Sequence, residues 1–118
     1  MRAIEYVRPC LTILQEFPDE VRSIFAHALM LASQDARHVE AEPLSVIPRT
    51  SAVELAVRDS GKTCRLVYTL DFPGMVYVIH ASHKPTHAGR LMLGAEIKLM
   101  TAQVKSIRAM RKKQGKQR

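Results

Sequence analysis

Basic and imidazole side chains gather in one part of this sequence and offer the chemistry of phosphate cleavage. Arg65 and Lys84 flank a segment that contains His80 and His83, and His87 follows shortly after. Guanidinium and ammonium groups bind phosphate oxygens, and an imidazole exchanges a proton near neutral pH. These groups suit cleavage of RNA, in which a 2′-OH attacks the adjacent phosphorus, a base takes its proton and an acid protonates the leaving 5′-oxygen.

The same residues allow other interpretations. A basic, half-polar sheet face is often only a solvated or partner-binding surface, and the residues alone leave this open beside catalysis. A metal site is disfavoured, because His80 and His83 are an odd number of residues apart on an extended strand and no CxxC lies nearby. No P-loop, GxGxxG, GxSxG or HExxH is present, so we expect no metal and no cofactor.

Two predicted strands and a turn position these groups. Residues 64–70 and 75–82 are rich in β-branched and aromatic side chains, and residues 71–74 form a turn signal with Phe72 and Pro73 as its loop. This alignment places Thr69 opposite Val76 and Arg65 opposite His80. It also predicts one apolar face made of Cys64, Leu66, Tyr68, Leu70, Met75, Tyr77, Ile79 and Ala81.

A second hairpin precedes the first. Residues 52–58 alternate between apolar and polar, and Ser60-Gly61 suits a two-residue turn. Val57 then faces Cys64 and Leu55 faces Leu66, so the apolar sets meet and a three-stranded antiparallel meander is expected. The polar face of the meander carries Glu54, Arg58, Arg65, Thr69, His80 and Ser82.

One helix before the meander and one after it in the sequence are expected, one covering the apolar face and the C-terminal helix or the tail flanking it. Apolar residues recur with helical spacing over residues 18–33 and again over residues 89–110. Residues 3–7 can add a short edge strand, residues 10–16 are ambiguous but fit a short helix, and residues 34–50 read as a polar connector. The predicted fold class is α+β, with one small antiparallel sheet packed against helices.

Composition indicates one domain with a basic end. The chain has 118 residues and a net charge of +7, and residues 108–118 hold six cations and no acid. We expect a domain over residues 1–110 and a basic tail over 111–118, frayed beyond about Met110. Arg111, Lys112 and Lys113 are candidates for contact with RNA backbone, although such runs are often only solvated.

The sequence also allows a prediction of the cellular compartment. No apolar run approaches the roughly 20 residues that a membrane span needs, and the N-terminus lacks the layout of a signal peptide. The two cysteines, Cys10 and Cys64, fit reduced thiols better than a disulfide framework. We therefore expect a cytoplasmic protein without a membrane partner.

An ordered set of short motifs carries a family resemblance. The chain shows Pro43-Leu44, Val53-Glu54-Leu55, Arg65-Leu66-Val67-Tyr68, Val78-Ile79-His80-Ala81 followed by Lys84, and Glu96-Ile97 at a helix start. This order, over roughly residues 16–107, resembles the RelE/HigB-type toxins and specifically their phage-related branch. The resemblance implies a small antiparallel sheet with helices, as expected above. It also implies the toxin of a type II toxin–antitoxin system that cuts mRNA on the ribosome and pairs with a small helix-turn-helix antitoxin.

The resemblance also assigns roles and shows departures. Arg65 matches the strand arginine that contacts the scissile phosphate in such toxins, Lys84 matches a basic residue after the last strand, and His80 matches a histidine of the phage-related branch. Ala56 replaces a family arginine, with Arg58 two residues further on the same face. His87 and Arg90 are the only substitutes for a tyrosine found in some toxins. These departures keep an alternative open, a non-catalytic phage-derived relative that binds protein or RNA.

Overall fold

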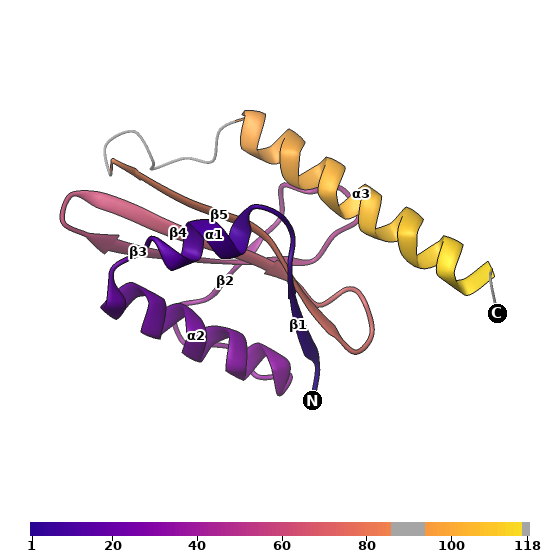
Figure 1. Ribbon diagram of the computed structural model, residues 1–118, viewed down its shortest axis with the longest axis horizontal. Coiled ribbons are helices and arrows are strands. Elements are labelled where there is room, and N and C mark those ends of the chain that lie inside the picture. Colours follow the sequence, from indigo (N-terminus) through magenta and orange to yellow (C-terminus); the bar gives the residue numbers. More distant parts are fainter. Residues whose placement is uncertain (86–93, 117–118) are drawn as a thin grey trace.

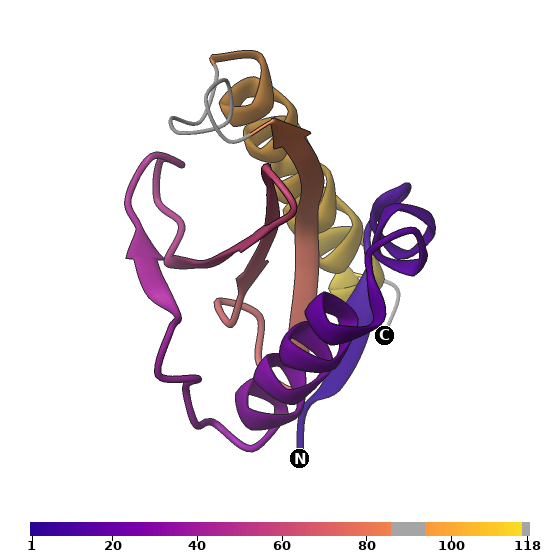
Figure 2. The same cartoon turned by 90° about the vertical axis from the view of Figure 1, so that its left-hand side faces the viewer.

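Within the described residues, 1–85 and 94–116, five strands form one sheet with helices on both faces (Figures 1 and 2). The structure is a computed structural model, and the strand order is β1-β5-β4-β3-β2. The elements are β1 Ala3–Tyr6, α1 Cys10–Gln15, α2 Asp19–Ser33, β2 Glu42–Leu44, β3 Ala52–Asp59, β4 Lys62–Thr69, β5 Met75–Pro85 and α3 Gly94–Lys116. The α+β class is confirmed, but the sheet has two more strands than the predicted meander.

The hairpin of β3 and β4 has the predicted register. Asp59 lies opposite Lys62, Val57 opposite Cys64 and Leu55 opposite Leu66. Ser60 and Gly61 both have positive φ, 48° and 77°, as a two-residue type I′ turn requires. The turn and the apolar alternation therefore specify the same pairing, which is why the sequence predicts it.

The predicted register of β4 against β5 is wrong. Arg65 lies opposite Ser82 and not opposite His80, and Thr69 lies opposite Tyr77. The register shifts between Val67 and Tyr68, which pair with His80 and Val78 and leave Ile79 over as an extra residue. This irregularity is a β-bulge, and together with a longer turn it displaces the pairing that a two-residue loop would give.

The bulge also changes which side chains of β5 share a face. Tyr77 and Ile79 were predicted beside Leu66 and Tyr68, but they pack on the opposite face with Val67. Both faces of β4 are consequently buried, whereas the prediction had one apolar and one polar face. The polar face exists only at one end of the sheet.

Helices α1 and α2 cover the first face. The helical spacing over residues 18–33 is confirmed by α2, which starts after Pro18 with Asp19 and Glu20 in its first turn. Its buried residues Phe25 and Leu29 pack with α1 and with the apolar side chains of β3, β4 and β5. Cys10 and Cys64 are buried free thiols in this core, and burial raises the pKa of Cys10 to about 11.

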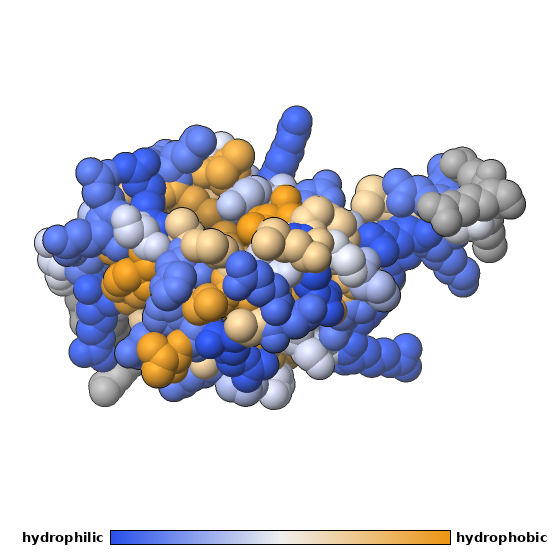
Figure 3. All heavy atoms as spheres, turned by 90° about the horizontal axis from the view of Figure 1, so that it is seen from below, coloured by the Kyte–Doolittle hydropathy of each residue, from blue (hydrophilic) through white to orange (hydrophobic). Residues whose placement is uncertain are grey.

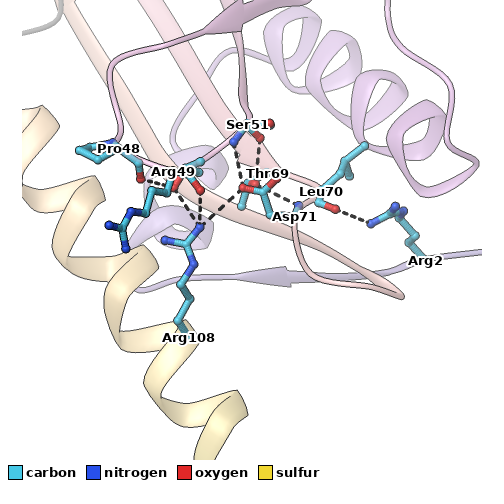
Figure 4. Close-up of polar contacts among 9 residues, drawn as sticks. Arg2, Pro48, Arg49, Ser51, Thr69, Leu70, Asp71 and Arg108 are labelled. Atoms are coloured by element: carbon cyan, nitrogen blue, oxygen red, sulfur yellow. Dashed lines mark hydrogen bonds and ion pairs between the residues drawn. The ribbon is translucent and has the colours of Figure 1, made fainter.

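Helix α3 covers the second face through Met100, Val104 and Ile107. Two arginines, Arg108 and Arg111, hold its C-terminal half against the β4–β5 turn. Figure 4 shows the first of them, Arg108, reaching Arg49 and Asp71. Arg108 donates to the carbonyl oxygen of Arg49 at 2.5 Å, and its guanidinium lies 5.9 Å from the centre of the Phe72 ring. The guanidinium of Arg111 lies 5.6 Å from the same ring centre. These contacts fix the helix at the end where the turn lies.

The expected end of this helix is wrong. Residues 111–116 continue α3 to Lys116, where fraying beyond Met110 was expected. Lys, Arg and Gln have good helix propensity, and Arg111 also donates to the Tyr77 hydroxyl at 3.3 Å. The projecting end of the helix is strongly hydrophilic (Figure 3).

One edge strand of the sheet was expected from the sequence and the other was not. The edge strand at residues 3–7 is confirmed as β1, which pairs in parallel with β5. Arg2 fixes it by donating to the carbonyl oxygens of Leu70 and Met75, both at 3.0 Å. The connector of residues 34–50 was expected to lack regular structure, but it contains β2.

A helix that crosses a membrane must be long and apolar, and the helices of the structure can be compared with this requirement. Over residues 1–85 and 94–116, none of them is both long enough and apolar enough to cross a membrane.

We predict that Phe72→Ala lowers the free energy of unfolding by about 3–5 kcal/mol. Phe72 is buried, meets Tyr77 edge-on at a ring-centre distance of 5.2 Å, and supports both arginines of α3. Urea unfolding measures the loss. The matched control is Leu99→Ala, since Leu99 lies on α3 and is 49% exposed. Its effect on the free energy of unfolding should stay within about 0.5 kcal/mol. Equal losses in the two variants would contradict the anchoring role of Phe72.

Candidate functional site

A cluster of charged side chains lies on the α3 face of the sheet, beyond the apolar part of that face. Arg65 comes from β4, His80 and Lys84 from β5, Glu54 from β3 and Glu96 from the first turn of α3. The register explains the grouping. Side chains two residues apart on a strand share a face, so the bulge at Ile79 brings His80 and Lys84 to the face of Arg65.

Arg65 and Glu54 form the sheet-bound half of this cluster. Arg65 is 8% exposed, and its Nη1 lies 3.7 Å from Oε2 of Glu54. Burial raises the pKa of Glu54, Arg65 partly offsets the rise, and Glu42 and Glu96 add to it. Oε2 of Glu54 is buried and accepts no hydrogen bond from the described residues. Glu54 is therefore a carboxylate with spare capacity to accept a proton.

His80 and Lys84 form the half nearer to α3, and Glu96 lies between them. Glu96 forms an ion pair with Lys84, and its Oε1 lies 3.8 Å from Nε2 of His80. His80 is 8% exposed, and burial lowers its pKa, an effect that Lys84 and Arg65 reinforce and Glu96 opposes. The imidazole is therefore neutral near pH 7, as a proton acceptor must be.

The remaining predicted site residues are placed differently. His83 lies on the opposite face, across from Cys64, with its ring centre 5.6 Å from that of Phe17. The predicted group of His80, His83 and Lys84 is therefore divided between two faces. Arg58 is exposed on the same strand face as Ala56, the residue opposite Arg65. His87 and Arg90 lie outside the described residues.

The three basic candidates near the end of α3 also differ from one another. Lys112 and Lys113 are exposed, whereas Arg111 is half-buried against Phe72 and Tyr77. The side chains of Lys112 and Lys113 are therefore open to a polyanion, and that of Arg111 supports the helix.

Sequence reasoning gave no role to the two carboxylates of the cluster. The alternation of β3 placed Glu54 on the correct face. A carboxylate among cations on that predicted face is a signal that could have identified Glu54 as a site residue. Glu96 was noted only as the start of a helix. Its approach to Lys84 depends on how α3 packs across the sheet, for which no local pattern exists.

The cluster offers groups for phosphoryl chemistry and none of the usual signs of a metal centre. In the part of the chain that the structure describes, no three His, Cys, Asp or Glu side chains converge as metal ligands. Arg65 and Lys84 can bind phosphate oxygens, and His80 and Glu54 can move protons. This set suits a reaction that needs cations and proton transfer.

Comparisons with known proteins agree with the fold. The family model described as phage-derived Gp49-like protein matches residues 12–100, well over half of the chain. The crystal structure of the isolated E. coli RelE toxin aligns with a TM-score of 0.54 at 20% identity, covering 91% of this chain and 99% of that one. Among curated protein sequences, no significant match is found.

We predict that His80 makes stability depend on pH. Because the pKa of His80 is lowered on folding, the unfolded chain binds more protons there than the folded protein as pH falls below about 6.5. The stability that His80 contributes is thus present above its unfolded pKa and is lost as pH falls through the lowered one. His80→Gln should flatten the unfolding free energy between about pH 7.5 and about pH 5.5.

Denaturant titrations over this range test the prediction. His27→Gln is the control, because His27 is exposed on α2, and it should retain the slope of the unsubstituted protein. If the unfolding free energy of His80→Gln keeps the same slope against pH, a group other than His80 causes the pH dependence.

Proposed function

Because this chain belongs to the phage-derived Gp49-like family and has the fold of the RelE toxin, we propose that it is the toxin of a type II toxin–antitoxin system. We propose further that it is a ribosome-dependent endoribonuclease that cleaves mRNA in the cytoplasm. The observation that carries this proposal is the convergence of Arg65, His80 and Lys84 on one sheet face, supplied by two strands and a bulge. A small helix-turn-helix antitoxin is the partner that we expect.

The proposed reaction is an intramolecular transesterification. The 2′-oxygen forms a bond to the adjacent phosphorus while the bond from phosphorus to the 5′-oxygen breaks. The 2′-proton passes to neutral His80 or to Glu54, and a protonated group supplies a proton to the leaving 5′-oxygen. The products are a 2′,3′-cyclic phosphate and a 5′-hydroxyl. Arg65, assisted by Lys84, stabilises the charge that develops on the phosphate oxygens.

A second candidate is supported by one observation. Arg65 lies 3.7 Å from Glu54, and Lys84 is paired with Glu96, so each cation already faces a carboxylate. Such neutralised pairs also suit a non-catalytic relative that binds protein or RNA through another surface. Induced expression with and without the neighbouring gene separates the candidates, because only the toxin should arrest growth and create new mRNA 5′ ends that the neighbour suppresses.

We predict that Arg65→Ala lowers the cleavage rate by about a hundredfold or more. A guanidinium donates to two phosphate oxygens at once, so Arg65→Lys should also impair cleavage. The readouts are single-turnover cleavage of ribosome-bound mRNA and growth after induction, with circular dichroism to establish folding. Arg22→Ala is the control, because Arg22 lies on α2 and pairs with Asp19. A folded Arg65→Ala variant that arrests growth as well as the unsubstituted toxin would refute the assignment.

We predict that the exposed lysines of α3 contribute salt-dependent binding to RNA. Each phosphate contact on a single strand changes the slope of log K against log salt by roughly 0.7, because counterions are released. The double variant Lys112→Ala, Lys113→Ala should therefore flatten the slope by about 1.4. Arg111 is left unchanged because of its contacts with Phe72 and Tyr77. An unchanged slope would mean that this end of the helix is only solvated.

A further inference from the structure

One carboxylate lies where an anionic substrate would need to bind. Glu96 is 12% exposed at its side chain, is paired with Lys84, and lies 3.8 Å from Nε2 of His80. A carboxylate and a phosphodiester are both singly charged anions with two exposed oxygens, so they compete for the same cations. A phosphodiester oxygen that bridges Nζ of Lys84 and Nε2 of His80 would occupy the position that Oε1 of Glu96 holds.

The charge pattern of α3 sets this residue apart. Between Gly94 and Lys116 Glu96 is the one acidic residue, whereas the helix carries seven basic ones. Its lysines at positions 98, 105, 112 and 113 are exposed. The single acid therefore faces the sheet cations while the positive charge of the helix is directed largely to solvent or to the β4–β5 turn.

We propose that Glu96 is a built-in competitor of the substrate phosphate, so that RNA enters the cluster by displacing this carboxylate from Lys84 and His80. The proposal rests on the proposed function for the identity of the anion. In the free protein, Glu96 satisfies Lys84 and closes the cluster. On binding, a phosphodiester replaces the carboxylate, and the first turn of α3 moves away from β5.

The anchoring of α3 makes this exchange possible. The apolar residues that hold the helix to the sheet begin at Met100, one turn after Glu96. The arginine contacts lie further on, at Arg111 and at Arg108, whose contacts Figure 4 shows. The turn that carries Glu96 precedes all of these contacts. It can therefore shift while the apolar anchor and the arginine contacts stay in place.

An unused bonding position in the cluster supports a ligand other than Glu96. Nε2 of His80 is buried and has no hydrogen-bond partner among the described residues, because the Glu96 oxygen is 3.8 Å away. A buried polar atom without a partner costs stability. Glu96 therefore pairs with Lys84 but leaves His80 unsatisfied, whereas a ribose hydroxyl or phosphate oxygen in its place can bond to both.

A binding assay that does not depend on cleavage tests the proposal. The probe is a short fluorescent RNA with 2′-O-methyl groups throughout, which lacks the attacking hydroxyl, and anisotropy gives its Kd. Because a self-occupied site lowers the apparent affinity, Glu96→Gln should tighten binding on the order of tenfold. The matched control is Glu20→Gln, which removes the same charge from the first turn of α2 and should change Kd by less than about twofold.

A double variant localises the competition. If Glu96 competes at Lys84, most of the gain from Glu96→Gln should vanish in a Lys84→Met background. In the unsubstituted protein, adding the probe should shift the side-chain carboxyl resonance of Glu96 and speed amide exchange in the first turn of α3. The NMR measurement decides the question even if a variant folds poorly.

The outcomes separate this inference from the proposed function. Tighter binding by Glu96→Gln in a protein that cuts no RNA supports the competitor and refutes the nuclease. Unchanged or weaker binding by Glu96→Gln, or a Glu96 resonance that the bound probe leaves in place, overturns the competitor. Weaker binding in particular would identify Glu96 as a positioning residue for Lys84.

Discussion

The β-bulge at Ile79 is the constraint on which the arrangement of β5 depends. A strand with uninterrupted alternation cannot present Ile79 and His80 to the same helix, because successive side chains point to opposite faces. The extra residue lets Ile79 complete the apolar contact with α3 while His80 and Lys84 continue along that face as polar groups. One irregularity thus joins a hydrophobic contact area to a charged cluster on a single strand.

Local patterns were sufficient to predict some elements of this fold. The β3–β4 turn has two residues with positive φ, so turn chemistry and apolar alternation agree, and α2 has both an apolar stripe and an acidic first turn. The β4–β5 pairing lacked such agreement. Its bulge places Ile79 in an apolar cluster with residues of α3, a distant part of the chain that no local pattern relates to β5. The sequence also gave no indication that both faces of β4 are buried.

The charged cluster likewise depends on contacts between distant parts of the chain that local patterns do not show. Arg65 and His80 were assigned correctly to one face, because the predicted partner of Arg65 and the observed partner, Ser82, are two residues apart and so share a face, although the direct pairing with His80 was wrong. The position of Glu96 depends on the tertiary packing of α3, and burial in the folded protein lowers the pKa of His80 and raises that of Glu54. The cations were therefore predictable from residue type, whereas the electrostatic balance of the cluster required the fold. That balance is what distinguishes a covered site from an open basic surface.

The parallel pairing of β1 with β5 has a kinetic consequence. Ala3 lies beside Met75, and Arg2 donates to the carbonyl oxygens of Leu70 and Met75, so an early segment of this chain is bound by a later one. Contacts of such long sequence separation form late, because loop closure must precede them. Helix α3 follows β5 in the chain and completes the second face. A nascent chain consequently cannot close its sheet before β5 has left the ribosome that makes it.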